Sequence, residues 1–233
     1  MIGRARRSAR SLCLSAIERL VQDAATLGVR LTSEDAGRLL TLTEELARWN
    51  RRYNLTAITS PAAMVTHHLL DSLAVHPDLS GARIADVGTG AGFPGLPLAL
   101  CNPQRHFTLI DSTAKKVRFV AHAAGLLALT NVSVLHARVE SLKVDVPFET
   151  VLARAFAPLP ELLEKVTAIC GPQTQVLAMK GKWPQKELAV IGPPWRVVRS
   201  RTIAIPGLDA ARCVIVLARS PPAAPATAAP AGV

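Results

Sequence analysis

The chain has 233 residues, and 49% of them are apolar, which suits one large domain or a core domain with a small appendage. No run of about 18 consecutive apolar residues occurs, so no membrane-spanning helix is expected. The 27 basic residues exceed the 17 acidic ones and give a net charge of +10, which favours polyanions such as RNA or DNA. Charge alone does not decide this, because GC-rich coding also produces arginine-rich sequences.

The first ten residues are rich in arginine and superficially resemble the start of a secretion signal. The apolar stretch that follows is interrupted at once by Glu18 and Arg19 and offers no cleavage site. We therefore expect residues 1–10 to form a flexible basic arm on a cytoplasmic protein. The cysteines are scattered and have no histidine at metal spacing, so we expect reduced thiols and no metal ion. They are Cys13, Cys101, Cys170 and Cys213.

Residues 11–80 carry helical signals and are expected to form an N-terminal helical subdomain. Apolar residues at i, i+3, i+4 and i+7 predict a first helix that ends at Gly28. A second helix is predicted to open at Thr32, because a capping residue is followed there by acids. Ser60 and Pro61 suit the N-cap and first position of a third helix. The apolar stripes of the three helices are Ile17, Leu20, Val21, Ala24 and Leu27; Leu39, Leu42, Leu46 and Trp49; and Val65, Leu69 and Leu73.

Residues 81–219 are expected to form an α/β core. Apolar strands alternate there with helical stretches, which predicts a mostly parallel sheet with right-handed crossovers. The last two strands lie close together, joined through Pro206 and Gly207, so one of them is expected to run antiparallel. Residues 220–233 are rich in proline and alanine and are expected to be disordered. The seven predicted strands are residues 82–87, 106–111, 131–136, 149–154, 173–180, 195–204 and 211–218.

A glycine-rich loop after the first predicted strand is the most informative feature of the chain. Asp86 ends the strand, and Gly88, Gly90 and Gly92 follow at alternate positions. Glycine has no Cβ, so the backbone can turn sharply and approach a ligand closely. A helix is expected to begin near Pro94. A strand, a glycine loop and a helix N-terminus together predict a nucleotide-type pocket at the carboxyl edge of the sheet.

The spacing of the loop indicates which ligand it holds. The fingerprint for a dinucleotide is G-x-G-x-x-G, whereas this loop reads G-x-G-x-G and follows a carboxylate. Asp86 would repel a pyrophosphate but suits a cation such as S-adenosylmethionine, which carries a sulfonium and no phosphate. Asp111 ends the next strand, where an acid commonly accepts hydrogen bonds from ribose hydroxyls. A glycine loop that is only a structural turn is the alternative.

Several separated motifs resemble one family, the bacterial 16S rRNA (guanine-N7) methyltransferases of the RsmG family, also called glucose-inhibited division protein B. The resemblance covers roughly residues 33–217. The glycine loop with its Pro-Gly ending is the most distinctive motif. The motifs are Trp49-Asn50, residues 53–56, 68–72 and 86–95, Asp111-Ser112, residues 116–119, 138–140 and 154–157, Lys180-Gly181, and residues 206–209.

The resemblance implies a class I S-adenosylmethionine-dependent methyltransferase fold, which is Rossmann-like, with a small N-terminal helical extension. It implies S-adenosylmethionine as the methyl donor and a guanine in the 530 loop of 16S rRNA as the acceptor. The cofactor contacts carried over from the family are Gly88, Phe93, Val139, Glu140 and Arg154. Arg154 is expected to pair with the carboxylate of the donor or with an RNA phosphate.

The RNA-contacting candidates are basic residues and one aromatic residue, because a base that leaves its stack needs a stacking partner. Arginine or Phe156 is expected to fill that role, since aromatic residues make up only 4% of the chain. The family usually has Glu-Arg-His near the last strand, whereas this chain has Ala211-Arg212-Cys213. The full set of candidates is Arg51, Arg52, Lys115, Lys116, Arg118, Arg138, Phe156, Lys180 and Arg212.

The expected chemistry needs no single general base, because N7 of guanine already carries an in-plane lone pair and no proton. The chain lacks the Pro-Pro-aromatic loop of methyltransferases that act on exocyclic amines. Cys170 is expected to be structural and not a nucleophile that activates a pyrimidine carbon. We expect packing and helix-capping roles, and no metal ligation, for His67, His68 and His76. The expected partner is 16S rRNA or the 30S subunit, and a monomer is expected. A small-molecule methyltransferase and a non-catalytic RNA-binding assembly factor are the alternatives.

Overall fold

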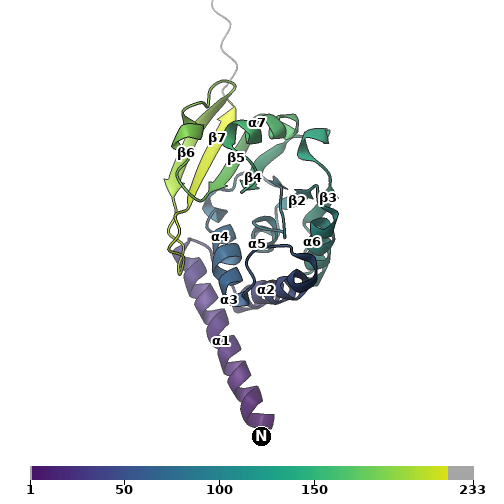
Figure 1. Ribbon diagram of the computed structural model, residues 1–233, viewed down its shortest axis with the longest axis vertical. Helices are drawn as coiled ribbons and strands as arrows, with labels where there is room; N and C mark the ends of the chain where they lie inside the picture. The colour runs from purple at the N-terminus through teal and green to yellow at the C-terminus, as the bar shows by residue number, and fades with distance from the viewer. Residues whose placement is uncertain (1, 220–233) are drawn as a thin grey trace, which may run out of the picture.

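The computed structural model describes residues 2–219 of the chain, with side chains from residue 14 onward. Its centre is a twisted seven-stranded sheet in the order β3-β2-β1-β4-β5-β7-β6 (Figure 1). Strands β1 to β5 run parallel, and β7 runs antiparallel to both β5 and β6. The predicted mostly parallel sheet with one antiparallel strand is confirmed. The strands are β1 (Arg83–Val87), β2 (His106–Asp111), β3 (Val132–His136), β4 (Phe148–Arg154), β5 (Cys170–Lys180), β6 (Trp195–Thr202) and β7 (Cys213–Arg219).

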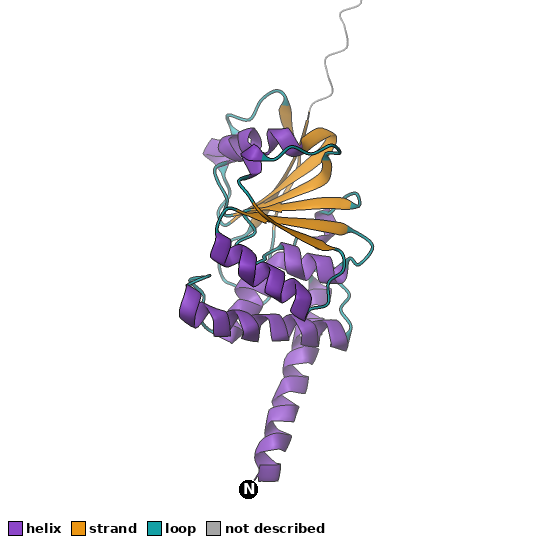
Figure 2. Cartoon of the chain, turned by 90° about the vertical axis from the view of Figure 1, so that its right-hand side faces the viewer, coloured by secondary structure: helices purple, strands orange, loops and turns teal. Residues whose placement is uncertain are grey.

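Helices cover both faces of the sheet, and the larger group lies on one side (Figure 2). Because side chains alternate along a strand, the two faces carry two separate apolar clusters. In β1, Ile84 belongs to one cluster, whereas Ala85 and Val87 belong to the other. The helices are α1 (Ile2–Thr26), α2 (Ser33–Tyr53), α3 (Pro61–Met64), η1 (Val65–Leu70), α4 (Asp71–Leu73), η2 (His76–Asp78), α5 (Gly95–Cys101), α6 (Ala114–Leu126), η3 (Val139–Ser141), α7 (Leu159–Val166), η4 (Thr167–Ile169) and α8 (Gln185–Leu188).

The end of the first helix and the start of the second lie close to their predicted positions, at Thr26 and Ser33. Helix α2 opens with a capping box in which the Asp35 backbone N–H donates to the Thr32 hydroxyl at 3.0 Å, and the Thr32 N–H donates to the Asp35 carboxylate at 3.3 Å. The expectation of a flexible basic arm is wrong for residues 2–10, because they form the first turns of α1. No helix among the described residues is long and apolar enough to cross a membrane. The predicted disordered tail lies outside the described residues.

The third predicted helix begins at Pro61, as expected, but it is not a regular α-helix. Residues Val65–Leu70 form a π-helical segment between two short α-helical pieces, and the Asp71 N–H donates to Thr66 O, five residues back. The wider turn shifts the side chains that follow it, and such π-segments are frequent at functional sites. Leu69 and Leu73 are buried, as predicted. The π-segment also places polar residues of this helix against the carboxyl end of β4.

Candidate functional site

The glycine loop between β1 and α5 turns through the left-handed backbone region that glycine permits, as its sequence predicts. Gly88, Gly90 and Gly92 have φ values of +65°, +62° and +87°, a region that residues with a Cβ rarely adopt. A Cβ at Gly88 would lie 2.4 Å from the Phe156 ring, and one at Gly92 would lie 2.3 Å from Leu96. The positive φ values and these side-chain contacts together favour glycine at both of these positions.

Asp86 lies behind this loop and not in front of it. Its side chain is 1% exposed, and one carboxylate oxygen accepts hydrogen bonds from the Thr89 hydroxyl at 2.6 Å and the Gly95 N–H at 2.8 Å. Burial raises the pKa of Asp86 from its ordinary 3.8 to about 6, although these two hydrogen bonds oppose the shift. Asp86 lines neither of the two cavities described below. The expectation that its carboxylate faces a cationic ligand is therefore wrong, because the carboxylate organises the loop.

A cavity of about 520 Å³ opens in front of the loop, at the carboxyl ends of β1, β4 and β5. It lies between the helical extension and the sheet core, because residues of both line it. Of the predicted site residues, Gly88, Gly90, Phe93, Lys116, Arg154, Lys180 and Arg212 line it. Residues from the helical extension that also line it are Leu55, Thr56, Ile58, His67, His68 and Asp71.

A second cavity, of about 260 Å³, adjoins the first, and both are lined by Gly88, Lys116 and Ala155. Asp111 at its wall accepts the Gly90 N–H at 2.9 Å with one carboxylate oxygen and the Thr113 N–H at 2.8 Å with the other. Five further predicted site residues line the second cavity: Asp111, Arg138, Val139, Glu140 and Phe156. Gly92, like Asp86, lines neither cavity.

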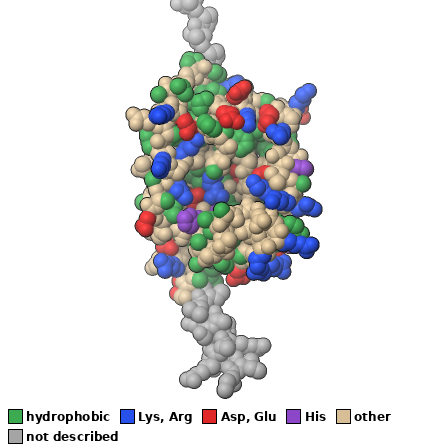
Figure 3. Space-filling view, viewed as in Figure 1, with side chains coloured by type: hydrophobic (Ala, Val, Ile, Leu, Met, Phe, Trp, Pro, Cys, Tyr) green, Lys and Arg blue, Asp and Glu red, His purple; other side chains and the backbone are tan. Residues whose placement is uncertain are grey.

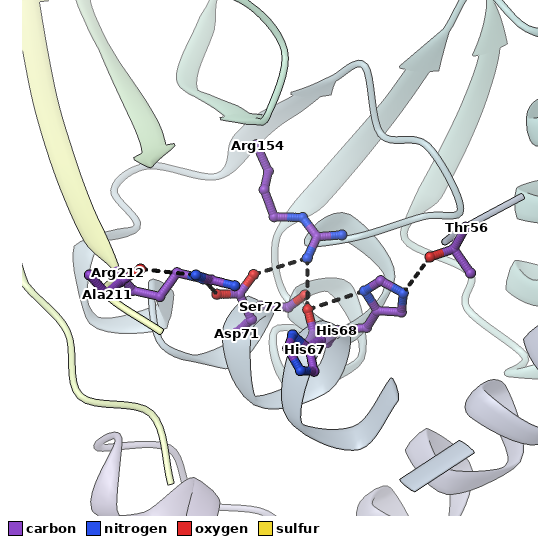
Figure 4. Close-up of polar contacts among 8 residues, drawn as sticks. All are labelled: Thr56, His67, His68, Asp71, Ser72, Arg154, Ala211 and Arg212. Atoms are coloured by element: carbon purple, nitrogen blue, oxygen red, sulfur yellow. Dashed lines mark hydrogen bonds and ion pairs between the residues drawn. The ribbon is translucent and has the colours of Figure 1, made fainter. Parts of the chain in front are cut away.

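Asp71 connects two predicted arginines in the first cavity (Figure 4). Its carboxylate oxygens accept a hydrogen bond from Arg154 Nη1 at 2.9 Å and from Arg212 Nε at 2.8 Å. Arg154 Nη1 also donates to the His67 carbonyl oxygen of the π-segment at 3.1 Å. One buried carboxylate thus holds two guanidinium groups from different elements, and the cluster keeps a net positive charge.

His68 lies on the other side of the same cluster and is held in its neutral form. Its ring stacks on Phe93 with 4.8 Å between centroids, and its Nε2 lies 3.0 Å from the Thr56 hydroxyl. Its Nδ1 lies 3.1 Å from the His67 carbonyl oxygen, so Nδ1 carries the proton and Nε2 accepts the Thr56 O–H. Burial, followed by the nearby Arg154 charge, lowers the pKa of His68 from its ordinary 6.5 to about 4.

The loop that carries Thr56 is held by Asn50 of α2. The Asn50 side-chain oxygen accepts the N–H groups of Leu55 and Thr56 at 2.6 and 2.9 Å, and its amide group donates to the Thr56 carbonyl at 3.0 Å. Asn54 adopts a left-handed conformation with φ of 47° and ends the helix. The motif around Asn50 and Thr56 therefore has a structural role, since it brings the helical extension to the wall of the cavity.

The predicted RNA contacts divide into restrained and exposed side chains. Lys115 Nζ donates to the Tyr53 carbonyl at 2.8 Å, and Lys180 Nζ donates to the Ala157 carbonyl at 2.9 Å. Lys116 lies 3.9 Å from the Asp111 carboxylate and lines both cavities. Lys and Arg side chains gather at the right-hand side of one face, the side on which α6 lies in Figure 1 (Figure 3). The exposed predicted contacts are Arg51, Arg52, Arg118 and Arg138.

We expect the neutral state of His68 to appear in the pH dependence of stability. Because its pKa is lower in the folded chain than in the unfolded one, its contribution is complete above about pH 6.5 and is lost as the pH falls towards about 4. The loss is on the order of 3 kcal/mol in the free energy of unfolding. Asp86 changes the free energy of unfolding in the opposite direction with pH. Because its pKa is raised in the folded chain, its contribution is lost as the pH rises through about 6.

The measurement is urea unfolding of the wild type and of His68→Gln from about pH 4 to about pH 8. Glutamine can still accept the Thr56 hydroxyl but does not titrate. Asp86 is present in both proteins, so its contribution cancels in the difference between their unfolding free energies. We expect this difference to shrink as the pH falls. A difference that does not change with pH would show that His68 titrates normally in the folded chain.

Comparison with known proteins gives a consistent result. The family model described as rRNA small subunit methyltransferase G matches residues 36–214 of the chain. A protein of that name from Saccharophagus degradans is 41% identical over 200 residues, which cover 86% of this chain and 90% of that protein. Another, from Azoarcus sp. strain BH72, is 42% identical over 202 residues and covers 86% of this chain and 95% of that protein.

Among solved structures, the likeness extends to methyltransferases of low sequence identity. Magnesium protoporphyrin IX methyltransferase from Synechocystis PCC 6803, solved with bound S-adenosylmethionine, aligns with a TM-score of 0.54 at 16% identity, over 75% of this chain and 91% of that one. A methyltransferase from Geobacter sulfurreducens in complex with S-adenosylhomocysteine aligns with a TM-score of 0.52 at 13% identity, over 76% and 98%. These likenesses confirm the predicted class I methyltransferase fold.

Proposed function

The chain belongs to the rRNA small subunit methyltransferase G family, a family of S-adenosylmethionine-dependent enzymes, and on this premise we propose that it methylates N7 of a guanine in the 530 loop of 16S rRNA. The observation that carries the proposal is the pair of adjoining cavities at the carboxyl edge of the sheet, which meet at Gly88. In open α/β sheets, ligands bind at this edge. We also propose that it acts in the cytoplasm, as a monomer, on 16S rRNA or the 30S subunit.

The residues of the second cavity suit the adenosine part of the methyl donor. Both Asp111 oxygens accept one backbone N–H each, and each keeps a lone pair for a ribose hydroxyl. Val139 offers an apolar surface for the adenine ring, beside the exposed Glu140. Gly88 lets a ligand pass from this cavity into the first, where Phe93 and Arg154 would contact the methionine part. The residues that line the two cavities therefore fit a compound that contains a nucleoside and an amino acid.

The proposed reaction is a direct displacement that moves no proton. The lone pair on N7 of guanine forms the new N–C bond, the S–C bond breaks, and its electron pair stays on sulfur. S-adenosylmethionine supplies the methyl group on a positively charged sulfur, and the positive charge ends on the purine. The main role of the protein is to orient N7 of guanine towards the methyl group. Correct positioning alone can lower such a barrier by roughly 7–11 kcal/mol.

The geometry of the first cavity supports positioning without a general base. His68 is neutral, but its Nε2 already accepts the Thr56 hydroxyl, so its lone pair is not directed at a substrate. Asp71 is paired with Arg154 and Arg212 through both of its oxygens. Neither group is therefore free to remove a proton, and N7 of guanine has none to remove. An exocyclic amine or a ring carbon would need such a group.

The test is transfer of a labelled methyl group to 16S rRNA, both naked and assembled in 30S particles, with the labelled nucleotide mapped afterwards. We expect one labelled guanine in the 530 loop and release of the label as 7-methylguanine on acid hydrolysis. Label that enters only small metabolites would support a small-molecule methyltransferase instead. RNA binding without any label would indicate a non-catalytic assembly factor.

A further inference from the structure

Trp183 is a large aromatic side chain with an unusual degree of exposure. The other two tryptophans of the chain are part of its packing. Trp49 contacts Tyr53 and Phe119 with ring centroids 5.3 and 5.5 Å apart, and Trp195 is only 5% exposed. Trp183, by contrast, is 47% exposed. An aromatic ring of this size in water is an available contact surface.

The position of Trp183 places it beside the first cavity. It lies in the loop between β5 and α8. Lys180, the last residue of β5, and Gly181, the first residue of the loop, line the cavity. Two residues of chain span at most about 7 Å, so the backbone of Trp183 is close to the cavity rim. A Cβ at Gly181 would lie 4.0 Å from Arg212 Nη1, so the loop also passes beside the Asp71 cluster.

The loop that carries Trp183 is held at both ends. Lys180 Nζ donates to the Ala157 carbonyl at 2.9 Å and to the Glu187 carboxylate at 2.8 Å. The same Glu187 oxygen accepts the Leu159 N–H at 2.5 Å, which ties α8 to α7. Pro184, directly after the tryptophan, is buried. A ring presented from a restrained loop loses little conformational entropy when it binds.

The charge around Trp183 indicates the chemistry of its partner. Lys182 and Lys186 are exposed on either side of it in the sequence. A flat aromatic ring between cationic side chains fits single-stranded nucleic acid, which offers a base for stacking and phosphates for the charges. Phe156, the aromatic residue predicted for this role, is half-buried and packs so closely on Gly88 that no Cβ fits between them. Phe156 is therefore engaged with the glycine loop.

We propose that Trp183 stacks on an unpaired RNA base next to the target guanine, and that Lys182 and Lys186 contact the phosphates beside that base. This inference rests on the proposed function and names a part of the RNA-binding surface. We expect Trp183 to act on RNA binding and not on the methyl donor. Trp183 lines neither the first cavity, which takes the methionine part of the donor, nor the second, which takes its adenosine part.

The kinetic test compares Trp183→Ala and Trp183→Phe with the wild type. Loss of one base stack costs about 5- to 150-fold in affinity, so we expect Trp183→Ala to raise the KM for RNA by this factor. Trp183→Phe should fall between the two, since phenylalanine keeps a smaller ring. The kcat and the affinity for S-adenosylhomocysteine should not change. Val190→Ala is the matched control, because Val190 is 68% exposed on the same part of the fold.

The binding test uses tryptophan fluorescence and a short single-stranded RNA with the sequence of the 530 loop. We expect RNA to quench the wild-type emission and to leave Trp183→Phe, which keeps only the two packed tryptophans, almost unquenched. Equal quenching in both proteins, or an unchanged KM in Trp183→Ala, would overturn the proposal. If the enzyme methylates both naked 16S rRNA and 30S particles, an effect of Trp183→Ala on the 30S reaction alone would also overturn it, in favour of a protein contact. Quenching at Trp183 in a wild type that methylates no RNA would support the inference and refute the proposed function.

Discussion

Gly88→Ala is expected to lower the affinity for S-adenosylmethionine at least about 30-fold and to reduce methyl transfer at subsaturating donor to the same degree. Two effects combine at this position. Its φ of +65° is strained for any residue with a Cβ, at a cost on the order of 1–3 kcal/mol. The added methyl would also lie 2.4 Å from the Phe156 ring, at the point where the two cavities meet.

The measurement is titration calorimetry with S-adenosylhomocysteine, beside thermal unfolding of the same samples. Gly125→Ala is the control, because Gly125 lies in α6 with nothing within 4 Å of an added Cβ. It is expected to bind the ligand normally and to be stabilised by roughly 0.5–1 kcal/mol. Adding Phe156→Ala to Gly88→Ala removes the collision but not the strained φ, so it should restore binding only in part. Normal binding by Gly88→Ala would refute the assignment of this loop to the donor.

Local sequence patterns predicted most of the fold, because each strand and cap depends on a few adjacent residues. All seven strands occur near their predicted positions, and β7 is the antiparallel one. The largest difference in the parallel strands is the start of β5, at Cys170 instead of residue 173. The capping residue Thr32 and the proline at position 61 begin the expected helices. These signals act over one turn of chain, so they can be interpreted without the tertiary structure.

The partners of the site residues could not be predicted, because they come from distant segments. The sequence motif 68–72 includes Asp71, but nothing local shows that Asp71 pairs with Arg154 and Arg212, 83 and 141 residues away. The π-segment, which brings the His67 carbonyl to Arg154, has no composition signal of its own. Asp86 was expected to face the ligand, because the spacing of an acid and a glycine loop does not reveal which side of the loop the acid occupies.

The charge cluster around Asp71 gives the second large expected effect. Asp71→Asn removes the negative charge that both arginines share and turns an amide N–H₂ group towards one of them. Breaking a buried ion pair by altering one partner costs about 3–5 kcal/mol, and the value here belongs near the lower end because asparagine keeps one acceptor. Since Arg154 and Arg212 line the first cavity, we also expect the kcat/KM for methyl transfer to fall about 100-fold, which corresponds to about 2.7 kcal/mol.

Asp78 provides a matched control for this variant. Like Asp71 it is 4% exposed and holds two arginines, with Arg199 at 2.9 Å and Arg201 at 2.6 Å, but it lies outside both cavities. Asp78→Asn is therefore expected to lower the melting temperature while activity stays within about twofold of wild type. If both variants lost stability but neither lost activity, the Asp71 cluster would be purely structural.

The kinetic constants of Asp71→Asn also indicate which anion the arginines bind. Assays are made at a temperature where the wild type and both variants are folded, as judged by circular dichroism. If Arg154 pairs with the carboxylate of the methyl donor, the KM for S-adenosylmethionine rises and the KM for RNA stays constant. If the arginines hold an RNA phosphate, the KM for RNA rises and its salt dependence becomes weaker, because fewer cations are displaced on binding. The first outcome is expected, because Arg154 lies 5.9 Å from the Phe93 ring centroid, beside the glycine loop.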